Sequence, residues 1–74
     1  MLAFLAEEHC RRSFGNEFVN LSDVRVHGNV VEIDLLVRTK DGDEGRERKR
    51  WIRNIGELIE RTYGVRIGIT VRIA

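Results

Sequence analysis

VRIGITVRI, residues 65–73, is the stretch that decides the fold. Its five odd-numbered positions are β-branched and apolar, and its four even-numbered positions are Arg, Gly, Thr and Arg. Alternation with a period of two is typical of a β-strand that buries one face. We therefore expect this strand to contribute to the core of a single domain over residues 1–74, since 74 residues are the size of one small domain.

Two more strands are predicted before it. Val24 and Val26 alternate with polar residues in a short strand, and a second alternating run covers residues 30–39. Gly28 and Asn29 lie between the two runs and are typical of a tight hairpin turn. The inward side chains of the second run are expected to be Val31, Ile33, Leu35 and Val37.

Two segments have helical spacing. In residues 2–13 one face carries Leu2, Leu5, Ala6, His9 and Ser13. The second helix begins after Asp41 or Asp43, either of which is a suitable N-cap, and ends at Gly64. Its core-facing arc is predicted to contain Trp51, Ile52, Ile55, Leu58, Ile59 and Tyr63. Gly56 borders this arc and costs about 1 kcal/mol relative to Ala in a helix, so we expect close packing against a neighbouring backbone there.

The order α-β-β-α-β predicts a two-layer α+β sandwich. Each strand has one apolar face, so both helices should cover the same face of a three-stranded sheet, antiparallel or mixed. With a right-handed crossover through the second helix, placing the first strand in the middle makes every pairing antiparallel, and this is the order we expect. The other sheet face should carry Arg25, His27, Glu32, Asp34, Leu36, Arg38, Arg66, Thr70 and Arg72.

Composition limits the function classes. Thirteen basic and twelve acidic residues give a net charge of +1, so electrostatic recognition has to be local. The single cysteine favours a reducing compartment, and we expect a soluble cytoplasmic protein without membrane insertion. A chain this short has a thin core, and self-association is the expected supplement.

No enzymatic signature is evident. His9, Cys10 and His27 are too few and too irregular in spacing for a zinc site. Glu32 and Asp34 share a strand face but are interpreted as partners of Arg66 and Arg72 in cross-strand ion pairs. No catalytic residue, metal or cofactor is therefore expected, and the chain is interpreted as a non-enzyme.

One local charge anomaly lies at the start of the second helix. Cations there oppose the helix dipole, and the residues concerned are Arg46, Lys49, Arg50 and Arg53. They form either a solvated helix face or a polyanion-binding stripe that captures phosphate. Residues 42–45, GDEG, match the G-x-x-G loop of KH nucleic-acid-binding domains, but the two acids favour a linker and helix cap.

Residues 24–35, VRVHGNVVEIDL, together with residues 55–62 and the boundary at 63–65, resemble the core of the alkaline shock protein family. The resemblance implies a hairpin, a helix and a strand in a non-enzymatic, self-associating, envelope-linked protein. The layout is also similar to the C-terminal domain of cation diffusion facilitators and to ring-building modules of secretion and sporulation machinery. These relatives dock to copies of themselves.

The sequence thus favours a non-enzymatic protein-protein interaction or self-assembly module. Met1 and Phe4 on the first helix, Val30 and Leu36 on the open sheet face, and the sheet edges are the expected contact surfaces for a homo-oligomer or an unknown protein partner. The alternative is a KH-like module that binds nucleic acid through the basic stripe.

Overall fold

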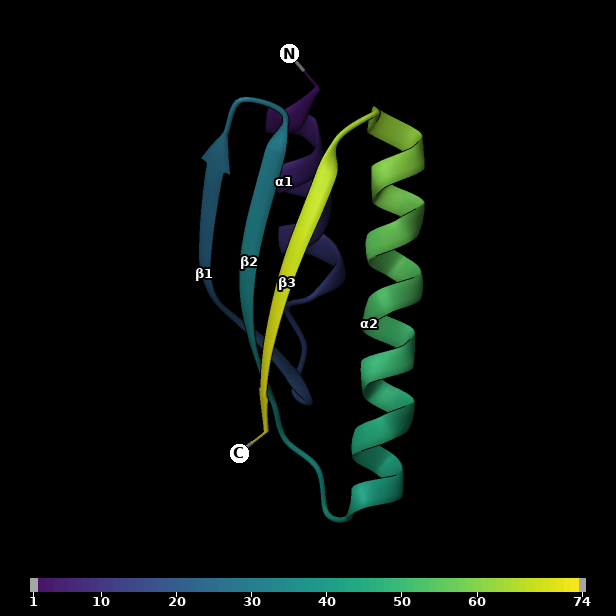
Figure 1. The fold of residues 1–74 in the computed structure, drawn as a ribbon. Coiled ribbons are helices and arrows are strands. Elements are labelled where there is room, and N and C mark those ends of the chain that lie inside the picture. The colour runs from purple at the N-terminus through teal and green to yellow at the C-terminus, as the bar shows by residue number, and fades with distance from the viewer. Residues whose placement is uncertain (1, 74) are drawn as a thin grey trace.

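Two helices and three strands follow one another in the order α-β-β-α-β in the computed structural model, which describes residues 2–73 (Figure 1). The elements are α1 (Ala3–Ser13), β1 (Val19–His27), β2 (Val30–Val37), α2 (Gly42–Tyr63) and β3 (Arg66–Ile73). The predicted α+β class and element order are confirmed.

The sheet is mixed, and β2 is its central strand. β1 pairs with β2 antiparallel, and β3 pairs with the other side of β2 in parallel. The predicted order, with the first strand in the middle, is wrong. The turn at Gly28, whose φ of 61° favours glycine, keeps β1 against β2, and α2 is the crossover of an ordinary β-α-β unit that returns the chain to the free side of β2.

β1 is longer than predicted and contains a β-bulge at Ser22. Leu21 pairs with Leu35 and Val24 with Ile33, so the register shifts by one residue between Leu21 and Asp23. The bulge lets Leu21 and Val24 face the core on the same side although they are three residues apart. The Ser22 hydroxyl donates to the carbonyl of Asp34 at 3.0 Å.

The core lies between the sheet and both helices. The predicted inward side chains of β2 are all buried. They pack in one cluster with helical residues, namely Ala3, Ala6, Cys10 and Phe14 of the first helical segment and Ile52 and Ile59 of α2. Figure 1 shows α1 behind the sheet and α2 standing beside β3. α1 contacts β1 and β2, whereas α2 contacts α1 and β3.

The core-facing sides of the helices differ in part from the prediction. In α1 the small residues Ala3 and Cys10 are buried, and Leu2 and Leu5 are exposed. Small side chains allow α1 to approach the sheet closely, which turns the larger leucines outward. In α2, Trp51 and Leu58 are 40 % and 47 % exposed, because a three-stranded sheet and one short helix cannot cover the whole predicted arc.

Both ends of α2 form as predicted. The Asp41 side chain caps the N-terminus by accepting from the backbone N–H of Glu44 at 2.8 Å. Gly64 ends the helix with a φ of 65°, in the left-handed region. These caps hold α2 at 22 residues, or about 33 Å at 1.5 Å per residue, which is long enough to run beside the whole of β3.

Candidate functional site

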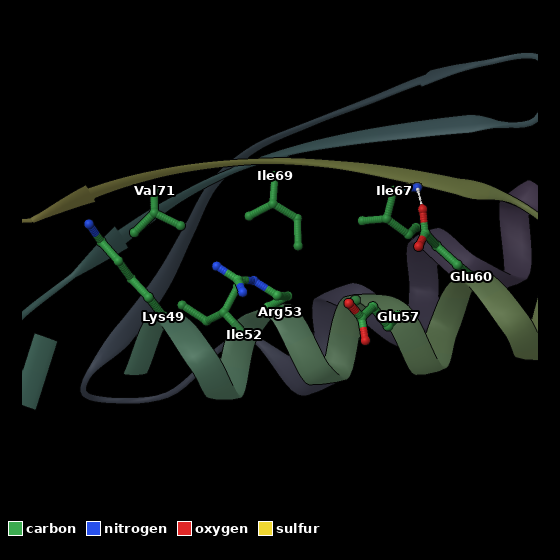
Figure 2. A pocket seen from close by; sticks show the side chains of 9 residues that line it. Lys49, Ile52, Arg53, Glu57, Glu60, Ile67, Ile69 and Val71 are labelled. Atoms are coloured by element: carbon green, nitrogen blue, oxygen red, sulfur yellow. Dashed lines mark hydrogen bonds between the residues drawn. The ribbon is translucent and has the colours of Figure 1, made fainter. Parts of the chain in front are cut away.

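A groove of about 350 Å³ runs between β3 and α2. Its lining comes from these two elements, and the residues are Lys49, Ile52, Arg53, Gly56, Glu57, Glu60, Ile67, Ile69 and Val71. Figure 2 shows Ile67, Ile69 and Val71 pointing from β3 toward α2. The groove is therefore bounded by a strand edge on one side and by one face of a helix on the other.

The middle of the groove is apolar and is kept open by a glycine. A Cβ atom built on Gly56 would lie 2.8 Å from Cδ1 of Ile69. The predicted close approach at Gly56 is thus present, but the neighbour is a side chain and not a backbone. Ile67, Ile69 and Val71 remain only half-buried, since no helical side chain covers them at this point.

The backbone of β3 has one side free. The N–H of Arg66 donates to the carbonyl of Asn29 at 2.9 Å and thus faces β2. Backbone groups alternate sides along a strand, so those of Ile67, Ile69 and Val71 face away from β2. Within residues 2–73, the outward N–H groups of Ile69 and Val71 have no hydrogen-bond partner.

Glu60 occupies one end of this free edge. Its Oε2 accepts from the backbone N–H of Ile67 at 2.8 Å, as Figure 2 shows. A helical side chain therefore does for Ile67 what a neighbouring strand does in a complete sheet. Beyond Ile67 the edge is open, which leaves Ile69 and Val71 as the accessible part.

Charge is distributed unevenly along the groove. Lys49 lies at the Val71 end, and Glu57 and Glu60 lie at the Ile67 end, with Arg53 between them (Figure 2). On the opposite sheet face β3 carries two exposed arginines, Arg66 and Arg72. Among the residues that the structure describes, Lys49, Arg53, Arg66 and Arg72 form no ion pair. The β3 edge is therefore flanked by four cations, two on each side of the sheet, that lie outside the ion pairs of the described residues.

The predicted basic stripe does not form one uniform surface. Arg46 is paired with Asp43, and Lys49 and Arg53 line the groove. Arg50 is exposed and lines neither that groove nor the hollow beside it at the start of α2. Only two of the four cations thus contribute to the same concave site.

The predicted self-association residues are not brought together. Met1 lies outside the described residues. Phe4 is 62 % exposed on α1, whereas Val30 and Leu36 are half-buried near opposite ends of β2. Charged side chains at positions 32 and 34 separate them on that sheet face. Self-association through these residues therefore stays a prediction.

Ion pairs cover the open sheet face, although with a different partner from the one predicted. Arg25 on β1 contacts Glu32 at 3.4 Å and Asp34 at 3.2 Å. Its hydrogen bonds hold the pKa of the Asp34 carboxyl below its ordinary value, and the charge of Arg72 acts in the same direction. The register of β3 explains the difference, since Arg66 pairs with Val30 and Arg72 with Leu36, so that Gly68 and Thr70 lie opposite Glu32 and Asp34.

Cys10 and His9 do not form a nucleophilic pair. Cys10 is fully buried, and burial raises the pKa of its thiol to about 11, with a smaller contribution from the charge of Glu7. His9 is directed to another element, because its Nδ1 lies 3.0 Å from the hydroxyl of Tyr63. Over residues 2–73 no three His, Cys, Asp or Glu side chains gather in a way that could hold a metal ion.

No family model, no curated protein and no solved structure matches the chain. In the described part of the chain, neither helix combines the length and the apolar character needed to cross a membrane.

The sequence did not identify the groove itself. Ile67, Ile69 and Val71 were expected to be ordinary core residues of the last strand. The signal that points to the groove is Gly56, because a costly glycine beside the core arc indicates a close neighbour. Recognising that this neighbour belongs to a sheet edge requires the strand order.

Proposed function

We propose that this chain is a non-enzymatic protein-protein interaction module that acts through the free edge of β3 and the groove beside it. The observation that carries the proposal is the pair of backbone N–H groups at Ile69 and Val71, which have no partner among residues 2–73 and lie next to a half-buried apolar row. A strand edge offers hydrogen bonds to any extended backbone, and an adjacent groove offers side-chain selectivity.

The other sheet edge is less suitable. β1 is interrupted by the bulge at Ser22, and bulges twist an edge strand away from further pairing. β3, in contrast, pairs with β2 in an unbroken register from Arg66 to Ile73. The two edges thus differ in regularity, and the regular one borders the groove.

Photo-cross-linking tests the proposal. A benzophenone amino acid replaces Arg53 in the groove, and the control replaces Asn54, which is exposed on the same helix but does not line the groove. In cells that make this protein naturally, we expect covalent protein adducts at position 53 and few at position 54. Equal adduct formation at both positions, or none at position 53, contradicts the proposal.

A homo-oligomer is the self-assembly form of the same proposal, in a reducing compartment such as the cytoplasm. Light scattering and the concentration dependence of unfolding measure it, because association stabilises only the folded state. Adducts at position 53 that join two copies of the chain support this form. Adducts with another protein support a hetero-complex.

Nucleic acid is a second candidate, favoured by the exposed cations Lys49, Arg50 and Arg53, none of which forms an ion pair within residues 2–73. Binding of an oligonucleotide should then weaken steeply between about 50 and 200 mM salt. The double variant Arg50→Glu/Arg53→Glu should lose it. Absence of salt-sensitive binding at low ionic strength rules this candidate out.

A further inference from the structure

We infer that the occupant of the groove is an extended segment of another protein that adds to β3 as a fourth strand, with apolar and acidic residues in alternation. The inference deepens the proposed function and rests on it. It specifies the shape of the partner, its backbone conformation and its charge, each from a separate feature of the fold.

The first feature is the width of the two layers. Two packed helices, each about 10 Å in diameter, occupy about 20 Å, whereas three neighbouring strands at about 4.8 Å each occupy about 14 Å. Because α1 covers β1 and β2, α2 is displaced to the outer side of β3, where Figure 1 shows it. A fourth strand would lie beneath α2 and cover Ile67, Ile69 and Val71. The sheet is thus one strand narrower than its helical layer.

The space that α2 occupies above the free edge argues against a second copy of the chain as the occupant. If two copies paired β3 with β3 about a two-fold axis, both α2 helices would lie on the same face, close to the axis. They would then overlap, since helix axes need about 8–10 Å. If β3 instead paired with β1 of another copy, the bulge in β1 would interrupt the new row of backbone hydrogen bonds. A segment without a helix of its own fits without either conflict.

Side-chain chemistry specifies the two faces of the added strand. On the groove side it would face Ile67, Ile69 and Val71, so apolar residues fit there. On the open side it would lie beside Arg66 and Arg72, which have no ion-pair partner among the described residues. Opposite charges on neighbouring strands are favourable. Acidic residues therefore fit on the open side, and the pattern alternates.

Nucleic acid matches this edge less well than a peptide does. The groove lining contains no aromatic side chain on which a base could stack. Glu57 and Glu60 at one end would repel a phosphate backbone. Free N–H groups at every second residue match the spacing of a peptide strand.

Synthetic peptides of eight residues, the length of β3, test the inference. The main peptide alternates Val or Ile with Glu. One control replaces each Glu by Lys, and a second has the same composition in a non-alternating order. In two further controls the backbone nitrogens of alternate residues are N-methylated, either the apolar set or the acidic set, so that each blocks one edge of the strand. Binding to the unaltered protein is measured by calorimetry, and contacts are mapped by amide NMR.

We expect the main peptide to bind and to shift the amide signals of β3 and of residues 49–60. The Lys peptide and the reordered peptide should bind at least tenfold more weakly. One of the two N-methylated peptides should also bind at least tenfold more weakly. Only one edge of the added strand donates hydrogen bonds to β3, and the other edge faces solvent. The variant Arg66→Glu/Arg72→Glu should reverse the preference between the Glu and Lys peptides.

Three results overturn the inference. The first is equal binding of both N-methylated peptides and the main peptide, or no binding of the main peptide at all. The second is a dimer in light scattering in which the N–H groups of Ile69 and Val71 become protected from exchange, which identifies a second copy. The third is an oligonucleotide that occupies the groove while the main peptide does not.

Failure of this inference is separable from failure of the proposed function. If adducts form at position 53 in cells but no alternating peptide binds, the edge is a contact surface for a partner of different chemistry. If neither is observed, both proposals fall.

Discussion

A Cβ atom on Gly56 would lie 2.8 Å from Cδ1 of Ile69, so the absence of a side chain at position 56 and the position of Ile69 depend on each other. Cδ1 is the far end of a side chain that borders the open groove, and it has space to rotate away. The contact therefore explains the glycine without making it indispensable.

Gly56→Ala should change stability only slightly in the wild-type background. The helix gains about 1 kcal/mol from Ala, and displacement of the Ile69 side chain costs about 0.5–1.5 kcal/mol if it leaves its preferred rotamer. In the Ile69→Val background Cδ1 is absent, and the same substitution should stabilise by about 1 kcal/mol. Urea unfolding of the four proteins of this double-mutant cycle measures the coupling. An identical effect of Gly56→Ala in both backgrounds contradicts the contact.

Asp34 should make the fold sensitive to acid. Its pKa is lowered from 3.8, mainly by hydrogen bonds from Arg25, so its ionised form stabilises the folded state above the ordinary pKa. This contribution is lost as the pH falls from about 4 through the lowered value. Asp34→Asn should therefore flatten the decline in unfolding free energy over that range. Glu17→Gln is the control, because Glu17 forms no ion pair within residues 2–73. Equal acid dependence in wild type and Asp34→Asn counts against the Arg25 cluster.

Cys10 should react slowly with alkylating reagents. Its pKa is raised from 9.0 to about 11 by burial, which lowers the thiolate fraction near pH 8 by about a hundredfold relative to the unfolded chain. Burial also restricts access of the reagent. The rate of iodoacetamide modification, measured with and without urea, should differ by at least this factor. Comparable rates in both states would show that the Cys10 thiol is accessible in the folded protein and that its pKa is not raised.

The raised pKa of Cys10 also predicts that the unfolding free energy declines at alkaline pH. A raised folded-state pKa stabilises the protein while the thiol is neutral, and this contribution is fully present below pH 9 and declines toward pH 11. Cys10→Ala should remove that component of the alkaline decline. A decline of the same steepness in Cys10→Ala and wild type would show that Cys10 does not titrate with a raised pKa.

The local sequence pattern was sufficient to predict the helices and strands but not the order of the strands in the sheet. The alternation of β2 and the stop at Gly64 are short-range features that were predicted from the residues themselves, and Asp41 is one of the two N-caps that the sequence left open. The order of the strands depends on which side of β2 the long crossover returns to, and periodicity does not contain that information. The bulge at Ser22 was missed for a related reason, since it becomes visible only when Leu21 and Val24 are both paired with β2.

The candidate site shows the same division. Lys49 and Arg53 were predicted as part of a basic stripe because their helical spacing is evident in the sequence. Their role as one wall of a groove depends on the displacement of α2 to the outer side of β3. That displacement follows from the different widths of the helical layer and the sheet, and it cannot be predicted from any single residue.

Amide hydrogen exchange of the isolated monomer, followed residue by residue by NMR, tests the open β3 edge most directly. Ile69 and Val71, whose N–H groups face outward, should exchange within about tenfold of an unstructured chain, whereas Gly68 and Thr70, whose N–H groups face β2, should be protected by orders of magnitude. Ile67 should fall between these limits because Glu60 accepts from its N–H. Protection of Ile69 and Val71 equal to that of Gly68 and Thr70 in the monomer would contradict the account.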